Sequence, residues 1–235
     1  MLHINEFLVN KRIDKKIDQN VYTYFPNSKI ELIENIKELL YKEEHNLNRI
    51  DTSKIKDMSS LFCMVDIINA GIANIDFDIS DWNVSKVTNM RHMFDKCKQF
   101  NCNLYNWDVS KVKNMEAMFI GCSKFEGKGL ENWNVGKVNN MNFMFSGCRS
   151  FDQNIVKWNV SNVKNMSGMF CDCENFNQPL NNWDVSNVED ISYMFSGCKK
   201  FDQDLNDWDV SKVRNMKYMF NICKMSKNTP KWYKQ

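Results

Sequence analysis

The sequence predicts an α/β repeat protein, built as a right-handed solenoid with a parallel sheet on one side, short helices on the other and a capping helix at the N-terminus. Three observations support this prediction. One motif recurs about every 25 residues along most of the chain. The apolar residues inside the motif change from strand-like to helix-like spacing. A unit of this length cannot bury its own apolar face, whereas stacked copies can.

The repeat is defined by three residue types that keep one interval. Successive tryptophans, phenylalanines and cysteines are each separated by 25, 26, 25, 25 and 25 residues. The predicted structural core consists of Trp82, Trp107, Trp133, Trp158, Trp183, Trp208, Phe94, Phe119, Phe145, Phe170, Phe195 and Phe220. The single longer interval contains Gly127 and Gly129, where an extra residue can form a bulge.

Each repeat is predicted to contain one short helix. Five apolar residues of the first full repeat fall within an arc of about 120° when each residue turns the helix by about 100°. They are Val87, Met90, Met93, Phe94 and Cys97. Ser85 precedes them and is a favourable N-cap residue, because its hydroxyl can accept a hydrogen bond from an exposed amide of the first turn.

A short strand is predicted ahead of each tryptophan. In the last repeat, Phe201, Gln203 and Leu205 alternate with Asp202 and Asp204. Alternation over five residues is typical of a strand with one buried face. Each repeat is therefore expected to run from a strand, through a corner at the tryptophan, into a capped helix.

The ends of the chain set the expected domain boundaries. Residues 1–46 are predicted to form an N-terminal cap, with a helix over about 28–44 that begins in the capping box Ser28 and Glu31. Residues 47–223 contain one degenerate and six full repeats, with an insertion after the degenerate one. Residues 224–235 are predicted to be a lysine-rich C-terminal cap or tail.

The repeat resembles a known family. The unit FDQDLNDWDVSKVRNMKYMFNIC, residues 201–223, is similar to the BspA-like, mycoplasma lipoprotein-type leucine-rich repeat through its W-[DN]-V-S-x-V-x-x-M-x-x-M-F-x-x-C core. The resemblance covers roughly residues 47–223. It implies a leucine-rich-repeat-like solenoid that acts in adhesion or protein binding, with no established enzymatic activity. It offers no catalytic residues to transfer to this chain.

Composition gives no indication of a nucleic-acid or membrane partner and favours a reducing compartment. The formal net charge is only +2, so no strong field favours nucleic acid or an anionic membrane. No signal peptide or membrane-spanning stretch is recognisable, and nine cysteines, an odd number, favour a reducing compartment. We therefore expect a cytoplasmic protein, with the cell surface as the alternative if the N-terminus is misassigned.

Neither catalysis nor metal binding is predicted. One cysteine in each repeat cannot converge with others on a zinc ion, so the cysteine column is interpreted as buried packing. The close pair Cys171 and Cys173, and the isolated Cys102, are alternative redox candidates. The three histidines lie in no arrangement that suggests a nucleophile and its base. No glycine-rich phosphate loop is present, and no cofactor is expected.

The leading functional hypothesis is a non-enzymatic protein-interaction scaffold, because a solenoid presents an extended surface whose outward residues can vary without disturbing the core. Outward-facing strand positions would form an amide and acidic stripe, the candidate binding face: Asn101, Asn103, Asp152, Asn154, Asn177, Asp202 and Asp204. A protein partner and a monomeric chain are expected. The alternative is a surface-displayed adhesin or virulence-type protein. The tryptophan column could instead stack on bases or sugars, but corner packing is the favoured interpretation.

Overall fold

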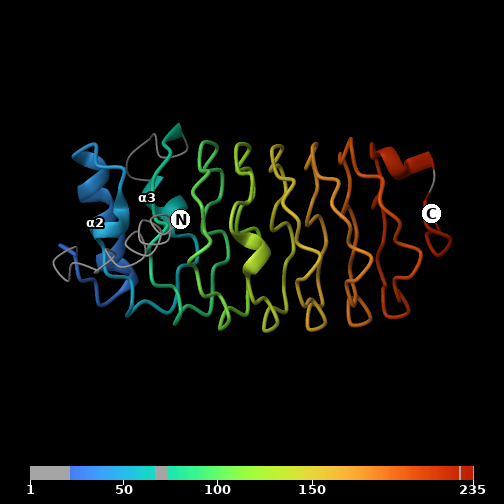
Figure 1. The fold of residues 1–235 in the computed structure, drawn as a ribbon, viewed down its shortest axis with the longest axis horizontal. Helices are drawn as coiled ribbons and strands as arrows, with labels where there is room; N and C mark the ends of the chain where they lie inside the picture. Colours follow the sequence, from blue (N-terminus) through green and yellow to red (C-terminus); the bar gives the residue numbers. More distant parts are fainter. Residues whose placement is uncertain (1–21, 67–73, 228, 235) are drawn as a thin grey trace, which may run out of the picture.

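The computed structural model describes residues 22–66, 74–227 and 229–234. The chain winds in successive coils that stack along the long axis of the molecule, with α2 at one end and the C-terminal tail at the other (Figure 1). The helical elements are α2 (Lys29–Tyr41), η2 (Leu47–Arg49), α3 (Leu61–Asp66), η4 (Leu130–Asn132) and η5 (Lys224–Lys227).

The predicted right-handed, leucine-rich-repeat-like solenoid with a parallel sheet and short helices is wrong. In the described residues no sheet forms, because the pairing between coils is reduced to isolated parallel bridges such as Asn114 with Asn140 and Asn140 with Asn165. The helices predicted after each tryptophan are also absent from the full repeats, where the same segments form consecutive turns.

Backbone conformation explains why the helices do not form. Every full repeat is left-handed at the same two positions, with φ between 50° and 76°. The first column contains His92, Ala117, Phe143, Gly168, Tyr193 and Tyr218, and the second contains Lys96, Gly121, Gly147, Asp172, Gly197 and Ile222. A right-handed helix cannot contain left-handed residues. The spacing of three that suggested a helix instead reflects three-residue turns, in which Met118 N donates to Met115 O and Cys122 N to Phe119 O.

Backbone amides that would bond within a helix instead join each coil to the next. At each junction four alternate residues donate, and every acceptor lies in the following coil. In one coil they run from Met115, Ala117, Phe119 and Gly121 to the carbonyls of Asn140, Asn142, Met144 and Ser146, at 2.7–3.0 Å. This ladder satisfies buried backbone donors without a conventional sheet.

Aromatic side chains fill the interior of the stack. The twelve aromatic residues of the predicted core are all buried, at most 4% exposed. Phe119 stacks between Phe94 and Phe145, with ring centroids 5.2 and 5.7 Å away. The tryptophans also form polar contacts between coils, because each indole N–H donates to a carbonyl of the preceding coil. Trp133 Nε1, for example, lies 3.2 Å from Leu104 O.

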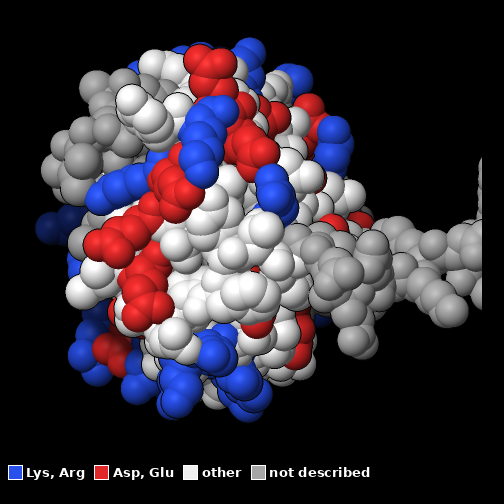
Figure 2. All heavy atoms as spheres, turned by 90° about the vertical axis from the view of Figure 1, so that its left-hand side faces the viewer, with Lys and Arg blue, Asp and Glu red and all other residues white. Residues whose placement is uncertain are grey.

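Both ends of the stack carry additional segments. The helix expected over about 28–44 is α2, where Ser28 Oγ accepts from Glu31 N and Leu32, Ile36 and Leu39 are buried. Figure 2 shows this end, with a band of interleaved positive and negative side chains beside an uncharged area. Residues 1–21 of the expected cap and 67–73 of the insertion lie outside the described residues.

The C-terminal tail partly extends the stack. Trp232 stacks on Trp208 at 6.3 Å, and its Nε1 donates to Leu205 O in the same way as the repeat tryptophans. Tyr233 packs edge-on against Phe220, with centroids 5.0 Å apart. The tail therefore covers the aromatic interior of the last coil without repeating the ladder of backbone bonds.

Candidate functional site

The seven residues of the candidate binding face fall into two columns that run along the stack. Both columns also include residues that sequence reasoning missed, notably Asp76 and Asp78. Column A contains Asp76, Asn101, Glu126, Asp152, Asn177 and Asp202, and column B contains Asp78, Asn103, Lys128, Asn154, Pro179 and Asp204. The preceding insertion obscured the first two members, although their distances of six and four residues before Trp82 identify them. We call the two columns the polar face.

Side chains of column A hold neighbouring coils together. Asn177 N donates to Asp152 Oδ1 and Asp202 N donates to Asn177 Oδ1, both at 2.9 Å. Glu126 N donates to Asn101 Oδ1 at the same distance. Because an Asx oxygen in one coil accepts from the amide one coil later, these residues have a structural role in addition to any binding role.

Side chains of column B instead fix the turn that leads to the tryptophan. Asn154 Oδ1 accepts from Val156 N at 3.1 Å, and Asp204 Oδ1 accepts from Asn206 N at 2.9 Å. Asn103 bonds Tyr105 N in the same way. An Asx side chain that bonds the amide two residues later stabilises a turn. The Oδ2 atoms of Asp152 and Asp204 bond no described residue and are available to a ligand.

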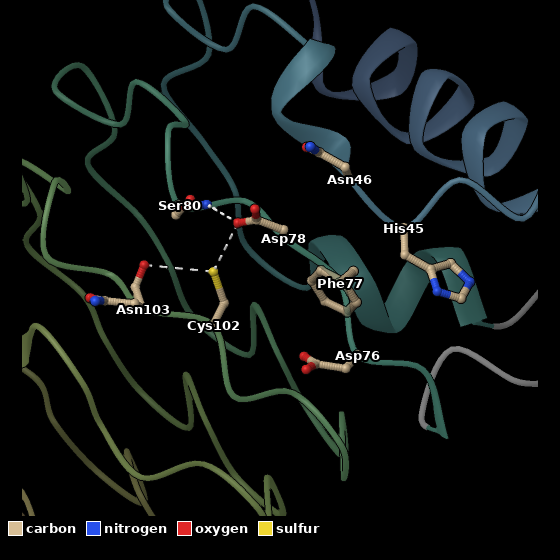
Figure 3. Close-up of a pocket in the computed structure, with 8 residues that line it drawn as sticks. All are labelled: His45, Asn46, Asp76, Phe77, Asp78, Ser80, Cys102 and Asn103. Atoms are coloured by element: carbon tan, nitrogen blue, oxygen red, sulfur yellow. Dashed lines mark hydrogen bonds between the residues drawn. The ribbon is translucent and has the colours of Figure 1, made fainter. Parts of the chain in front are cut away.

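A hollow of about 510 Å³ lies at the N-terminal end of the polar face (Figure 3). Its lining residues are His45, Asn46, Asp76, Phe77, Asp78, Ser80, Cys102 and Asn103. Asp78 Oδ1 accepts from Ser80 N at 2.9 Å and from Cys102 Sγ at 3.5 Å. Burial raises the pKa of Asp78, but hydrogen bonds from Ser80, Asn48 and Cys102 outweigh it and lower the pKa below its ordinary value. Asp78 is therefore an ionised acceptor at neutral pH.

The thiol in this hollow has the wrong electrostatics for a nucleophile. Burial raises the pKa of Cys102 to about 12, and the charges of Asp78 and Asp76 act in the same direction. The His45 ring turns away from Cys102 and Asp78 (Figure 3). Burial likewise raises the pKa of Cys171, the other redox candidate, to about 11. Since the thiolate is the reactive form, neither environment favours thiol chemistry.

Cys102 is expected to resist alkylation in the folded protein. A pKa of about 12 against an ordinary 9.0 reduces the thiolate fraction by about a thousandfold at neutral pH. Mass spectrometry after timed iodoacetamide treatment at pH 7.5 should show slow labelling of Cys102 in native protein and rapid labelling in denaturant. Native labelling at the rate of a free peptide thiol would contradict the assigned environment.

The cysteine column makes a polar contact between coils. The thiols of Cys122, Cys148, Cys173 and Cys198 each donate to a phenylalanine carbonyl of the preceding coil at 3.0 Å. Within the described part of the chain, no group of three or more His, Cys, Asp and Glu side chains is arranged to hold a metal ion. No helix among the described residues is long and apolar enough to cross a membrane.

The fold and the polar face define a tandem-repeat protein whose coils each add equivalent residues to one surface. The chain belongs to the family described as Mycoplasma protein of unknown function, DUF285, whose model matches residues 30–129 and 120–232. This match supports the expected mycoplasma-type repeat family and does not extend to the BspA-like leucine-rich repeat. Comparisons with curated proteins and with solved structures found no match.

Proposed function

We propose that this chain is a non-enzymatic protein-interaction scaffold that binds its partner on the polar face. The observation that carries the proposal is that two aspartates of the polar face use only one carboxylate oxygen to bond the backbone. Asp152 and Asp204 each engage Oδ1 with a backbone amide. The fold thus orients these two carboxylates and leaves their Oδ2 atoms for a partner.

Charge on the polar face favours a basic partner segment. Its acidic members are all exposed: Asp76, Asp78, Glu126, Asp152, Asp202 and Asp204. Lys128 is the basic residue within the columns, and its Nζ is paired with Glu126 Oε2 at 2.7 Å. Lys224 pairs with Asp202 Oδ2 at 2.7 Å. Carboxylates remain in excess after these pairings, which favours encounter with a positively charged surface.

The electrostatics of the hollow at the N-terminal end of the polar face favour binding over proton transfer. In the described hollow, the thiol has a raised pKa and the carboxyl a lowered one. A general acid or nucleophile at neutral pH needs the opposite shifts. The side chains of this face are therefore better suited to hydrogen bonding and charge recognition than to proton transfer.

The test replaces Asp152, Asp202 and Asp204 together with asparagine. Asparagine keeps the Oδ1 acceptor for the bond between coils and for the turn and removes the charge, whereas lysine would break the bonds from Asn177 N and Asn206 N. We expect capture of the partner from native cells to fall at least about tenfold, since each charge contact contributes on the order of 1 kcal/mol. The melting temperature should change by no more than about 2 °C.

A matched control carries the same charge change elsewhere. Asp108, Asp184 and Asp209 follow their tryptophans and accept from the serine amide two residues later, and Asn159 does the same in another coil. Replacing Asp108, Asp184 and Asp209 together with asparagine should leave capture of the partner unchanged. The captured protein is then purified and titrated against both triple variants. Equal dissociation constants for the two variants would exclude the polar face as the binding site.

A further inference from the structure

The C-terminal end of the stack has an unfinished row of backbone donors. At each of the five preceding junctions between full repeats, four alternate amides donate to carbonyls of the following coil. In the last full coil the equivalent amides belong to Met216, Tyr218, Phe220 and Ile222. None of them has an acceptor among the described residues. We call these four amides the terminal donor row.

The donor row has a single polarity. The last coil receives bonds from the preceding one at the carbonyls of Asn215, Lys217, Met219 and Asn221, so its carbonyls point back into the stack. Its alternate amides therefore point the other way. Tyr218 and Ile222 have φ of 59° and 53°, and successive amides in alternating left- and right-handed conformations form concave sites for negatively charged or carbonyl oxygens.

The surroundings of the row are open and basic. A hollow of about 500 Å³ is lined by Met216, Lys217, Tyr218, Asn221, Tyr233 and Lys234. Neither Lys217 nor Lys234 forms an ion pair with a described carboxylate. Tyr218 is 57% exposed and its ring lies 5.1 Å from that of Tyr193. The tail packs on the Phe220 ring, and two residues of the row, Met216 and Tyr218, line the open hollow.

We propose that the terminal donor row binds an acidic peptide segment of another protein, which adds to the stack as a further coil edge. The four amides at alternate residues can each donate a hydrogen bond to a peptide backbone that presents carbonyls at alternate residues. Every internal junction is an example of that match: Asp190, Ser192 and Met194 accept from Met166, Gly168 and Phe170 at 2.7–3.0 Å. Lys217 and Lys234 select for acidic side chains in the added segment.

A second copy of this chain does not fit the row as well. To complete the ladder it would have to offer the carbonyl edge of its own first coil. At that end α2 packs against α3, and Lys29 Nζ contacts Ser59 Oγ at 2.9 Å and Asp57 Oδ2 at 3.8 Å. Part of that edge, from Leu61 onward, lies in helix α3, and α2 packs against α3.

The experiment uses the full chain and a synthetic peptide of residues 186–198, SNVEDISYMFSGC, with blocked ends. In the protein this segment occupies an internal donor row and carries Glu189 and Asp190. Hydrogen exchange is followed by NMR with and without the peptide. Saturating peptide should slow exchange at Met216, Tyr218, Phe220 and Ile222 by at least about tenfold. A scrambled peptide of the same composition should protect them less.

Charge variants test the selectivity of the site. Replacing Lys217 and Lys234 with glutamine should raise the dissociation constant of the peptide about threefold to tenfold. The same change at exposed Lys111 and Lys137 should leave it unchanged. The triple asparagine variant of the polar face should also bind the peptide normally, so this proposal and the proposed function can fail separately.

Three results would overturn the proposal. The first is no slowing of exchange at the four amides with saturating peptide. The second is equal protection by inorganic phosphate alone, which would define a small-anion site. The third is protection that rises with protein concentration in the absence of peptide, together with dimer formation in sedimentation experiments, which would define an interface between copies.

Discussion

Replacing Phe119 with alanine is expected to lower the free energy of unfolding by about 3–5 kcal/mol, the usual cost of truncating a buried phenylalanine. Its side chain is 0% exposed. Its ring lies 4.2 Å from Phe125 and stacks on the rings of the coils on both sides. Truncation therefore leaves a cavity at two junctions between coils and removes aromatic contacts worth about 0.5–1.5 kcal/mol each.

Urea denaturation followed by tryptophan fluorescence measures this loss. Tyr105, which is 61% exposed, provides the control: its replacement by alanine should change stability by no more than about 0.5 kcal/mol. If the Phe119 variant were as stable as the Tyr105 variant, the aromatic column would not be the structural core of the stack.

Replacing Gly129 with alanine is expected to cost about 2–5 kcal/mol. Gly129 has φ of 93° and is the N-cap of η4. A left-handed alanine costs on the order of 1–3 kcal/mol through backbone strain. The added Cβ would also lie 2.6 Å from Tyr105 Cα and 2.7 Å from the carbonyl carbon of Leu104. Backbone atoms cannot move aside like a flexible side chain, so crowding adds to the strain.

A variant at Gly121 separates the cost of backbone strain from the cost of crowding. It has a similar φ of 74°, but a Cβ there would meet its nearest neighbours in Lys96 at 3.4 Å. Alanine at Gly121 should cost only about 1 kcal/mol, because its column already accepts Asp172 and Ile222. Both variants are compared by urea denaturation. Equal losses of unfolding free energy at the two glycines would contradict the prediction, because they would mean that the backbone around Tyr105 makes room for the added Cβ at no cost.

The register of the repeat was predictable, but the local structure within it was not. Residues spaced by three, such as Met115 and Met118, lie on one face of a helix. They also point inward from consecutive three-residue turns, as they do here. Sequence periodicity cannot separate these cases. The left-handed residue between them is alanine in one coil, phenylalanine in another and tyrosine in two, none of which signals positive φ on its own.

The candidate binding face stays a prediction, but its residues reach the surface for a different reason from the one expected. Alternation placed Asp152, Asn154 and Asp202 on an outward face of a strand, whereas in the structure they face outward without a sheet. Their bonds to backbone amides were not predicted, because a bond such as Asn177 N to Asp152 Oδ1 spans 25 residues. The terminal donor row was likewise invisible in the sequence, since backbone amides carry no residue signature.

The sequence by itself determined which residues are equivalent from coil to coil and which are apolar enough to be buried, because a recurring pattern of side chains records the register of stacking. Tertiary structure alone decided how the backbone bonds are satisfied. Each amide such as Ala117 N finds its acceptor in the next coil, at Asn142 O. A helix would satisfy the same donor locally. The choice between the two depends on the free energy of the stacked coils as a whole, which no single repeat contains.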